Sequence, residues 1–246
     1  TTPSDIVLVD VPHPFHYYAN RIPADTHYLF VDIQTAADTL SQMALGKNRL
    51  YWITWWGSDT DPRGVIPFLA QKQAGFPEGE RQFKGYRVVW YNLTDRPFSL
   101  PTTLPAANVN FDNVLLLDGL AYSQTLSPGQ AGWATLHFSQ LSQTDINYKI
   151  SLRLRAPDGR LLAQDDRVIL NDRHFQTAAW PIEGWQQAAR LCQGGEKLND
   201  PTYTGPLTLE AVVYNAESLA AIAAYGVPTT NNDSVSAQIG EMEVKK

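Results

Sequence analysis

Two aromatic segments of the sequence contain the residue types that bind sugars, and the first follows an apolar run. Trp55 and Trp56 are followed there by Gly57, Ser58 and Asp59, which brings two indole rings close to a carboxylate. Indole faces stack on the apolar faces of sugar rings, and a carboxylate accepts hydrogen bonds from their hydroxyl groups. We therefore expect Trp55, Trp56 and Asp59 to be the place where the chain would bind a glycan.

Trp180 and Trp185 form the second segment and a second candidate sugar platform. Packing is the alternative for both segments, because aromatic side chains supply large buried areas. In that alternative Trp55 or Trp56 packs between two parts of the chain, while Trp52 belongs to a core. Trp180 and Trp185 would then cover one end of a sandwich. We favour packing over sugar binding for both segments.

The sequence predicts no metal site and no nucleotide site. His13 and His16 stand three residues apart near His27, but Pro14 disturbs a helical turn there and no third ligand completes the set. The single cysteine, Cys192, excludes a cysteine-based zinc site and an internal disulfide bond. No glycine-rich phosphate loop follows the first apolar run. We expect no cofactor.

The carboxylate pairs of the sequence do not predict a hydrolase. Asp165 and Asp166 are neighbours on an expected strand, so they point to opposite faces and cannot flank one bond. Asp59 and Asp61 have a better spacing, but Asp61 precedes a proline and is expected to cap a helix. No serine stands in a nucleophile elbow. No catalytic residue is therefore assigned.

The amino-acid composition predicts a hydrophobic core and no surface for binding nucleic acid. Of its 246 residues, 43% are hydrophobic and 18% charged, which is typical of a globular protein. The net charge is −6 and no basic stripe exists, so nucleic acid is not an expected partner. No apolar run is long enough for a membrane span. Because the chain begins at Thr1 and not at a methionine, we expect it to be a piece of a longer polypeptide or a processed form.

Residues 1–94 alternate strand and helix signals. Apolar runs predict strands at residues 6–9, 28–31, 50–55 and 86–91. Helix patterns at residues 35–45 and 61–75 separate the later strands. Strands separated by helices are typical of a parallel sheet. We expect residues 1–94 to form a small α/β (Rossmann-like) domain.

The hydrophobic period changes after a proline-rich segment, residues 95–108, which we interpret as a linker. In residues 109–246 apolar and polar residues alternate, most clearly in three segments: 134–138, 150–154 and 207–213. This period of two is typical of antiparallel strands with one buried face. The predicted fold class is therefore α+β overall, with an antiparallel β-sandwich after the small N-terminal layer.

Eight segments in order resemble the soluble C-terminal region of bacterial multi-spanning GT-C type glycosyltransferases. They are RLYWITW (49–55), DPRG (61–64), FKGYRV (83–88), LSPGQ (126–130), YKISL (148–152), DGRLLAQDD (158–166), GPLTL (205–209) and VYN (213–215). The chain is similar there to dolichyl-phosphate-mannose–protein mannosyltransferases and aminoarabinose transferases. One departure is Leu136-His137-Phe138, where sandwiches of that family often have a Tyr-Trp pair.

The resemblance implies a place outside the cytoplasm and a transmembrane partner, namely the rest of the same polypeptide. It implies a lipid-phosphate sugar donor for the whole enzyme, with a metal in some members. The family's catalytic carboxylates lie in loops near the membrane spans, so the resemblance assigns no catalytic residue to this chain.

Three functions follow as alternatives. The first is a non-catalytic extracytoplasmic accessory domain that helps a membrane glycosyltransferase to bind its acceptor or to assemble. The second is a free-standing carbohydrate-binding module, and the third is a hydrolase with an unrecognised site.

Overall fold

The chain forms two compact units, Thr1–Leu100 and Pro101–Lys246, in the computed structural model of the protein. The structure describes residues 1–10, 15–17, 19–28, 31–55, 61–101, 103–127, 132–180, 198–228 and 234–245, together with the backbone of 189–194. The second unit begins within the segment 95–108 that was interpreted as a linker, and its first strand starts at Ala106.

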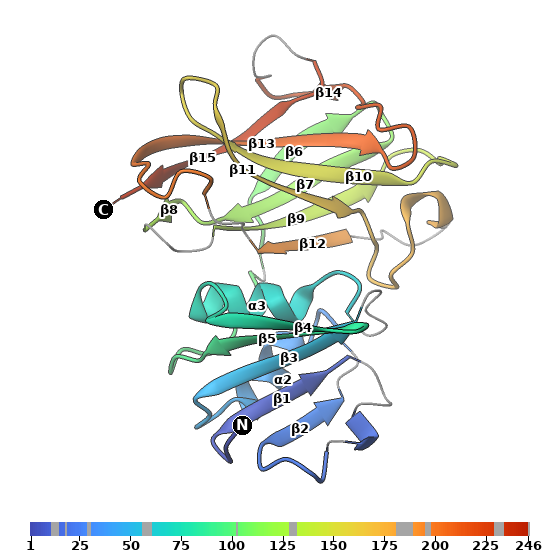
Figure 1. Ribbon diagram of the computed structural model, residues 1–246. Helices are drawn as coiled ribbons and strands as arrows, with labels where there is room; N and C mark the ends of the chain where they lie inside the picture. Colours follow the sequence, from blue (N-terminus) through green and yellow to red (C-terminus); the bar gives the residue numbers. More distant parts are fainter. Residues whose placement is uncertain are drawn as a thin grey trace. The chain divides into compact units, whose positions relative to one another are not determined.

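The first unit is built on a five-stranded mixed sheet with the order β2-β1-β3-β5-β4 (Figure 1). Its elements are β1 (Asp5–Val9), β2 (Asp25–Tyr28), α2 (Ala36–Met43), β3 (Arg49–Trp55), α3 (Val65–Ala74), β4 (Gly79–Phe83) and β5 (Tyr86–Asn92). Strand β1 lies between β2 and β3 and is parallel to both, whereas β5 is antiparallel to β3 and to β4. The carboxyl ends of β1 and β3 therefore lie side by side.

The predicted α+β fold class with a Rossmann-like parallel layer is wrong. Across the described residues the chain is mostly strand, with fifteen named strands and only two complete α-helices, α2 and α3. The first sheet is mixed because β4 and β5 form a hairpin around Lys84 and Gly85, where Gly85 has a φ of 84°. Glycine adopts this left-handed conformation without steric cost. The sequence interpretation treated β5 as one more parallel strand and missed β4.

Different segments of the chain pack on the two faces of the first sheet. Helix α3 packs against β3 and β5, and the residues of those strands that alternate toward it are buried: Leu50, Trp52, Val89 and Tyr91. On the opposite face Val7 and Val9 of β1 are covered by Phe15 and Ile22. Strand β1 is thus buried throughout, as its continuous apolar run predicts.

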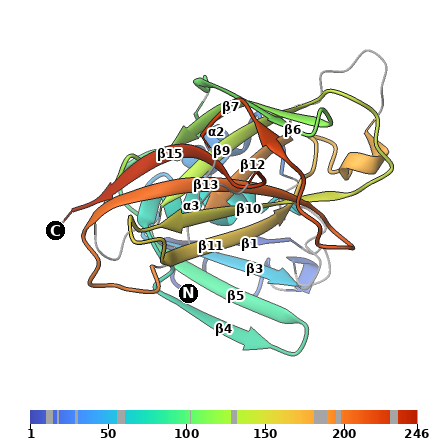
Figure 2. The same ribbon diagram turned by 90° about the horizontal axis from the view of Figure 1, so that it is seen from above.

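The second unit is a β-sandwich of two five-stranded sheets that lie one over the other (Figures 1 and 2). One sheet has the order β12-β9-β7-β6-β14 and the other β11-β10-β13-β15-β8. The first contains β6 (Ala106–Phe111), β7 (Leu115–Tyr122), β9 (Trp133–Gln140), β12 (Ala189–Gly194) and β14 (Ala224–Tyr225). The second contains β8 (Thr125–Leu126), β10 (Tyr148–Arg155), β11 (Leu161–Val168), β13 (Gly205–Asn215) and β15 (Ala237–Val244), with the short 3-10 helix η1 (Thr177–Ala179) outside both sheets.

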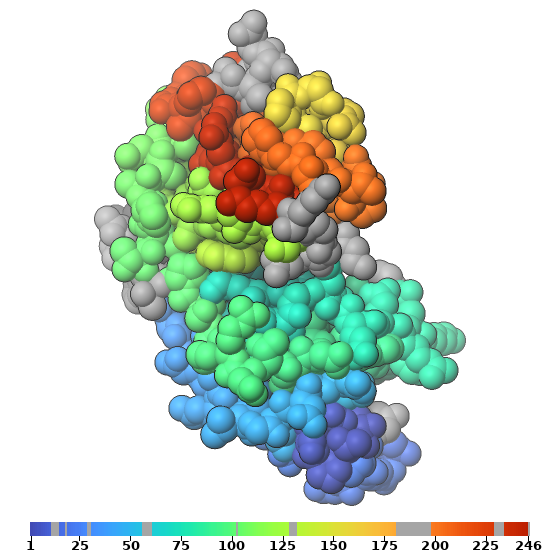
Figure 3. All heavy atoms as spheres, turned by 90° about the vertical axis from the view of Figure 1, so that its left-hand side faces the viewer, coloured from blue at the N-terminus to red at the C-terminus, as the bar shows by residue number. Residues whose placement is uncertain are grey.

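The sandwich core comes from the alternating residues that the sequence identified. Leu136 and Phe138 of β9 face Ile150 of β10 and Val213 of β13 across one buried cluster. Every strand pair is antiparallel except β8 with β15. The C-terminal strand β15, red in Figure 3, lies at the surface of this unit.

Candidate functional site

Three exposed aromatic side chains form a row across one end of the first sheet. Trp55 of β3 is paired with Tyr86 of β5, and Tyr86 is paired with Phe83 of β4. Directly opposed residues of an antiparallel sheet present their side chains on the same face, about 4.5–5.5 Å apart at Cβ. The exposed fractions are 42% for Trp55, 37% for Tyr86 and 48% for Phe83, so the row is open to solvent.

The same face continues from this row toward the other end of the strands. Trp90 of β5 is paired with Tyr51 of β3, and their ring centroids lie 6.2 Å apart. Trp90 also lies over Gly79, where an added Cβ would approach its Cζ2 atom to 2.4 Å. Glycine at this position therefore lets the indole lie flat against β4.

We call this surface the open face, and it consists of Tyr51, Ile53, Trp55, Phe83, Tyr86, Val88 and Trp90. All seven side chains are half-buried or exposed. An exposed apolar and aromatic patch of this kind is a common feature of interaction sites.

Charged side chains border the open face. The guanidinium of Arg49 donates a hydrogen bond to Tyr51 Oη at 3.1 Å and another to Asn92 Oδ1 at 3.2 Å. Glu78 Oε2 lies 3.4 Å from the same guanidinium. At the other end the guanidinium of Arg81 lies 5.2 Å from the ring centroid of Phe83. Hydrogen-bonding groups therefore stand next to aromatic faces, which suits a ligand with hydroxyl groups and an apolar ring face.

A buried polar cluster lies on the α3 side of the same sheet end. We call it the carboxyl-end cluster, and it consists of Asp10, Thr54, Asp61 and Arg63. Thr54 Oγ1 donates a 2.6 Å hydrogen bond to Asp10 Oδ2, joining the ends of β3 and β1. In sheets with parallel strands, ligands bind outside the carboxyl ends, at the place where the strand order reverses. Strand β2 lies on one side of β1 and strand β3 on the other, so the strand order reverses at β1. The carboxyl-end cluster lies at this place.

The carboxyl group of Asp61 has a strongly raised pKa. Burial raises its pKa to about 7, and the neighbouring Asp10 charge also raises it. Hydrogen bonds from the amides of Ile66 and Val65 and the charge of Arg63 oppose this rise in the pKa. Those amides donate to the two carboxylate oxygens at 2.8 and 2.7 Å. The carboxyl group thus holds the first turn of α3, and Asp10, Asp61 and Arg63 are all at least 95% buried.

Asp61 accepts hydrogen bonds from the first-turn amides of α3, as predicted for a capping residue, but it does not occupy the predicted N-cap position. Helix α3 begins at Val65, with Gly64 as its N-cap residue, so Asp61 reaches the amides of the first turn from four and five residues before them. Such a buried, perturbed carboxyl group is also a common mark of a functional site. Asp10, Thr54 and Arg63 were not identified from the sequence. The pairing of β1 with β3 brings Asp10 to Thr54, and Arg63, two residues from Asp61, was assigned no role.

A second polar group lies on the sandwich, on the neighbouring strands β7 and β9. Asp118 accepts a hydrogen bond from Ser139 Oγ and is paired with His137 Nδ1. The pairing register of β7 and β9 shifts between Leu117 and Gly119, which is a β-bulge at Asp118. Serine bonds the carboxylate here, not the imidazole, so the order of contacts differs from that of a serine hydrolase triad. His137 and Ser139 are 19 and 21 positions from Asp118 in sequence. No local sequence pattern predicts the bulge that brings them together.

The residues proposed as sugar platforms have different surroundings. Trp55 lies in the open face, while Trp56, Asp59 and Trp185 fall outside the described residues. Trp180 is only 3% exposed and belongs to the sandwich core, where its indole donates a 2.8 Å hydrogen bond to the Phe175 carbonyl. Its ring faces are thus occupied by protein atoms.

Trp52 is buried, which confirms its predicted place in a core. The packing of Trp55 or Trp56 between the two parts of the chain stays a prediction.

In the portion of the chain that the structure describes, no three histidine, cysteine, aspartate or glutamate side chains gather closely enough to hold a metal ion. His13 lies outside that portion. The helices described there include none with the length and apolar character needed to cross a membrane.

Comparison with known proteins identified no family. No family model matches the chain, and no curated protein matches it. Among solved structures, the CARDB domain of a Pyrococcus furiosus protein in complex with di-metal ions is 13% identical, with a TM-score of 0.31 over 55% of this chain and 96% of that one. Bacteroides uniformis beta-glucuronidase is 10% identical, with a TM-score of 0.32 over 61% of this chain and 19% of that one. These scores are too low to support an argument about function.

Proposed function

We propose that this chain is a non-catalytic accessory region of a bacterial membrane glycosyltransferase, and that its open face binds a sugar of the acceptor. The observation that carries the proposal is the exposed row Trp55, Tyr86 and Phe83 across three strands. The eight segments that resemble GT-C type enzymes support the parent enzyme, its extracytoplasmic location and its transmembrane partner.

The open face provides the two contacts that sugar recognition needs. Its aromatic rings offer flat apolar surface to the C–H groups of a sugar ring, and Tyr86 also carries a hydroxyl group. Each aromatic contact contributes about 0.5–1.5 kcal/mol beyond the area that it buries. Two or three such contacts give a Kd of roughly millimolar, which suits an acceptor that must be released after transfer.

The carboxyl-end cluster has a supporting part in this proposal. Thr54 precedes Trp55 directly, and its hydroxyl group is held by Asp10. The cluster therefore fixes the end of β3 from the α3 side, and Trp55 projects from the other side of the same strand end. A rigid strand end lowers the entropy that the ligand must offset on binding.

Glycan-array screening of the chain, followed by titration of the hits, tests the open face. Trp55→Ala, Tyr86→Ala and Phe83→Ala should each weaken binding by about 2–10-fold, because each removes one contact of the size given above. Leu45→Ala is the matched control, since Leu45 is an exposed apolar residue of the same unit outside the open face. Equal binding by all four variants would reject the open face as the sugar site.

The full-length coding sequence tests the parent enzyme separately. It should encode several apolar segments of about 20 residues in the same polypeptide as this chain. A polypeptide without such segments that still binds glycans through Trp55 would instead be a free-standing carbohydrate-binding module. The two experiments can therefore fail independently.

A further inference from the structure

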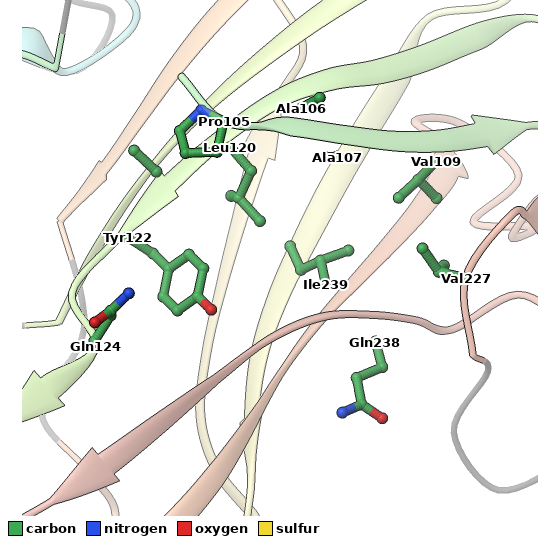
Figure 4. Close-up of a pocket in the computed structure, with 11 residues that line it drawn as sticks. Pro105, Ala106, Ala107, Val109, Leu120, Tyr122, Gln124, Val227, Gln238 and Ile239 are labelled. Atoms are coloured by element: carbon green, nitrogen blue, oxygen red, sulfur yellow. The ribbon is translucent and has the colours of Figure 1, made fainter. Parts of the chain in front are cut away.

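A cavity of about 380 Å³ opens into the sandwich at the edge where β6 and β15 meet. Leu120 and Tyr122 of β7 and Ile239 of β15 turn toward the same space, and Val109 and Val227 close its other end (Figure 4). Gln124 lies beside Tyr122. The volume falls within the range of small-molecule sites, which is roughly 300–1,000 Å³.

Irregular strand pairing occurs in two of the strands that line this cavity. The register of β6 with β7 shifts between Ala106 and Val109, and Asn108, within that shift, has a φ of 56°. The register of β15 with β13 shifts next to Gly240, which leaves Ile239 without a partner. Bulges bend a strand and often occur beside binding sites, because they re-aim side chains. Both irregularities lie in strands that line the cavity, β6 and β15.

Tyr122 is fixed at the cavity by β15. A Cβ added at Gly240 would lie 2.5 Å from Tyr122 Cζ, so the ring lies directly against the glycine. The amide of Glu241 also donates to Tyr122 Oη at 3.3 Å. This bond holds the phenol oxygen as an acceptor at the wall of the cavity, and a phenol hydroxyl that accepts a hydrogen bond can also donate one.

The lining of the cavity selects for an uncharged ligand. Eight of its eleven lining residues are apolar, and the other three are Tyr122, Gln124 and Gln238. A charged group placed there would lose its hydration without an opposite charge among these lining residues. An alkyl chain would instead bury its methylene groups, each worth about 0.8 kcal/mol.

We propose that this cavity binds a small uncharged amphiphile, with its aliphatic chain between the sheets and its hydrogen-bonding head beside Tyr122 and Gln124. The site lies wholly in the second unit and does not depend on the open face or on the proposed function.

The test is a titration of the chain with n-octyl glucoside below its micelle concentration, followed by NMR of the Val, Leu and Ile methyl groups. We expect saturable shifts at Val109, Leu120, Val227 and Ile239. Octanoate has the same chain length with a charged head, and glucose has no chain. Both should bind at least about tenfold more weakly, because one must desolvate a charge and the other buries no methylene group.

Two variants locate the site. Ala107→Leu places three more carbon atoms in the cavity wall and should weaken binding by about tenfold or more, as filling a pocket removes the space for the chain. Tyr122→Phe removes the hydroxyl group and should weaken binding by about 2–10-fold. Thr208→Leu on β13, which does not line the cavity, should leave binding unchanged.

The proposal is overturned if n-octyl glucoside causes no saturable shifts. It is also overturned if octanoate binds equally well, or if Ala107→Leu and Tyr122→Phe both fold and bind as the unchanged protein does. Circular dichroism melts check that each variant is folded. If Ala107→Leu does not fold, Tyr122→Phe and the comparison of the three probes decide the question.

Discussion

The pH dependence of stability should expose the buried carboxyl group of Asp61. Its pKa in the folded protein is about 7, raised by burial from its ordinary value of 3.8. Between these two values the folded chain binds a proton that the unfolded chain has released. The free energy of unfolding must therefore fall as the pH rises through this window, and it should level off above about pH 8.

The size of the effect follows from the same two pKa values. At pH 5 the proton on Asp61 is bound almost completely in the folded state, whereas at pH 7 it is bound about half the time. One pKa unit corresponds to about 1.4 kcal/mol, so the contribution of this group falls by about 2 kcal/mol between pH 5 and pH 7. Arg63 and Asp10 act on the group in opposite directions and do not change the sign.

The assay is urea denaturation at pH 5, 6, 7 and 8 for the unchanged chain, Asp61→Asn and Asp38→Asn. Asp61→Asn removes one of the two oxygen atoms that accept hydrogen bonds from the amides of α3, so at low pH the variant should be less stable than the unchanged chain. Its free energy of unfolding should change little between pH 5 and pH 7, because the titrating group is gone. Asp38 is an exposed carboxylate in the first turn of α2, and its variant should keep the original profile. If Asp61→Asn retains the same slope between pH 5 and pH 7, the assignment of the proton to Asp61 is refuted.

Three further substitutions test the packing inside each unit: two in the first unit and one in the second. The free energy of unfolding of each variant is measured by chemical denaturation. Thr54→Val should cost about 1–3 kcal/mol, because it removes the hydroxyl group that donates a hydrogen bond to buried Asp10; a neutral result would contradict the cluster geometry. Gly79→Ala should cost about 1–3 kcal/mol, since the new Cβ overlaps the Trp90 ring, and an unchanged Trp90 fluorescence would count against this contact. Trp180→Ala should cost about 3–5 kcal/mol as a core truncation, whereas a stable variant with altered sugar binding would restore it as a platform.

The sequence predicted several of the individual strands because hydrophobic period is a local signal. The apolar run at residues 6–9 and the alternation at residues 150–154 correspond to β1 and β10. The same signal does not report strand direction, so β5 was placed in a parallel sheet. Strand β4 was missed because its five residues, GERQF, are mostly polar and four of them are exposed.

The candidate site was predictable only in part, and for a similar reason. Trp55 was identified because its residue type and its place at a strand end are visible in sequence. Tyr86 and Phe83 join it only through the register of β3, β5 and β4, which no local pattern fixes. Asp10 meets Thr54 across 44 residues of sequence in the same way. Bulges such as the one at Asp118 leave no composition signal at all.

NMR of the tryptophan indole N–H groups during titration with a glycan found on the array reports directly on sugar binding at the open face. The chain has seven tryptophans, and Trp55→Phe assigns the signal of Trp55. We expect saturable shifts of the Trp55 and Trp90 signals, with the buried Trp180 signal unchanged. Saturable binding that leaves the Trp55 signal in place, or that persists at full strength in both Trp55→Ala and Tyr86→Ala, would contradict sugar recognition at the open face.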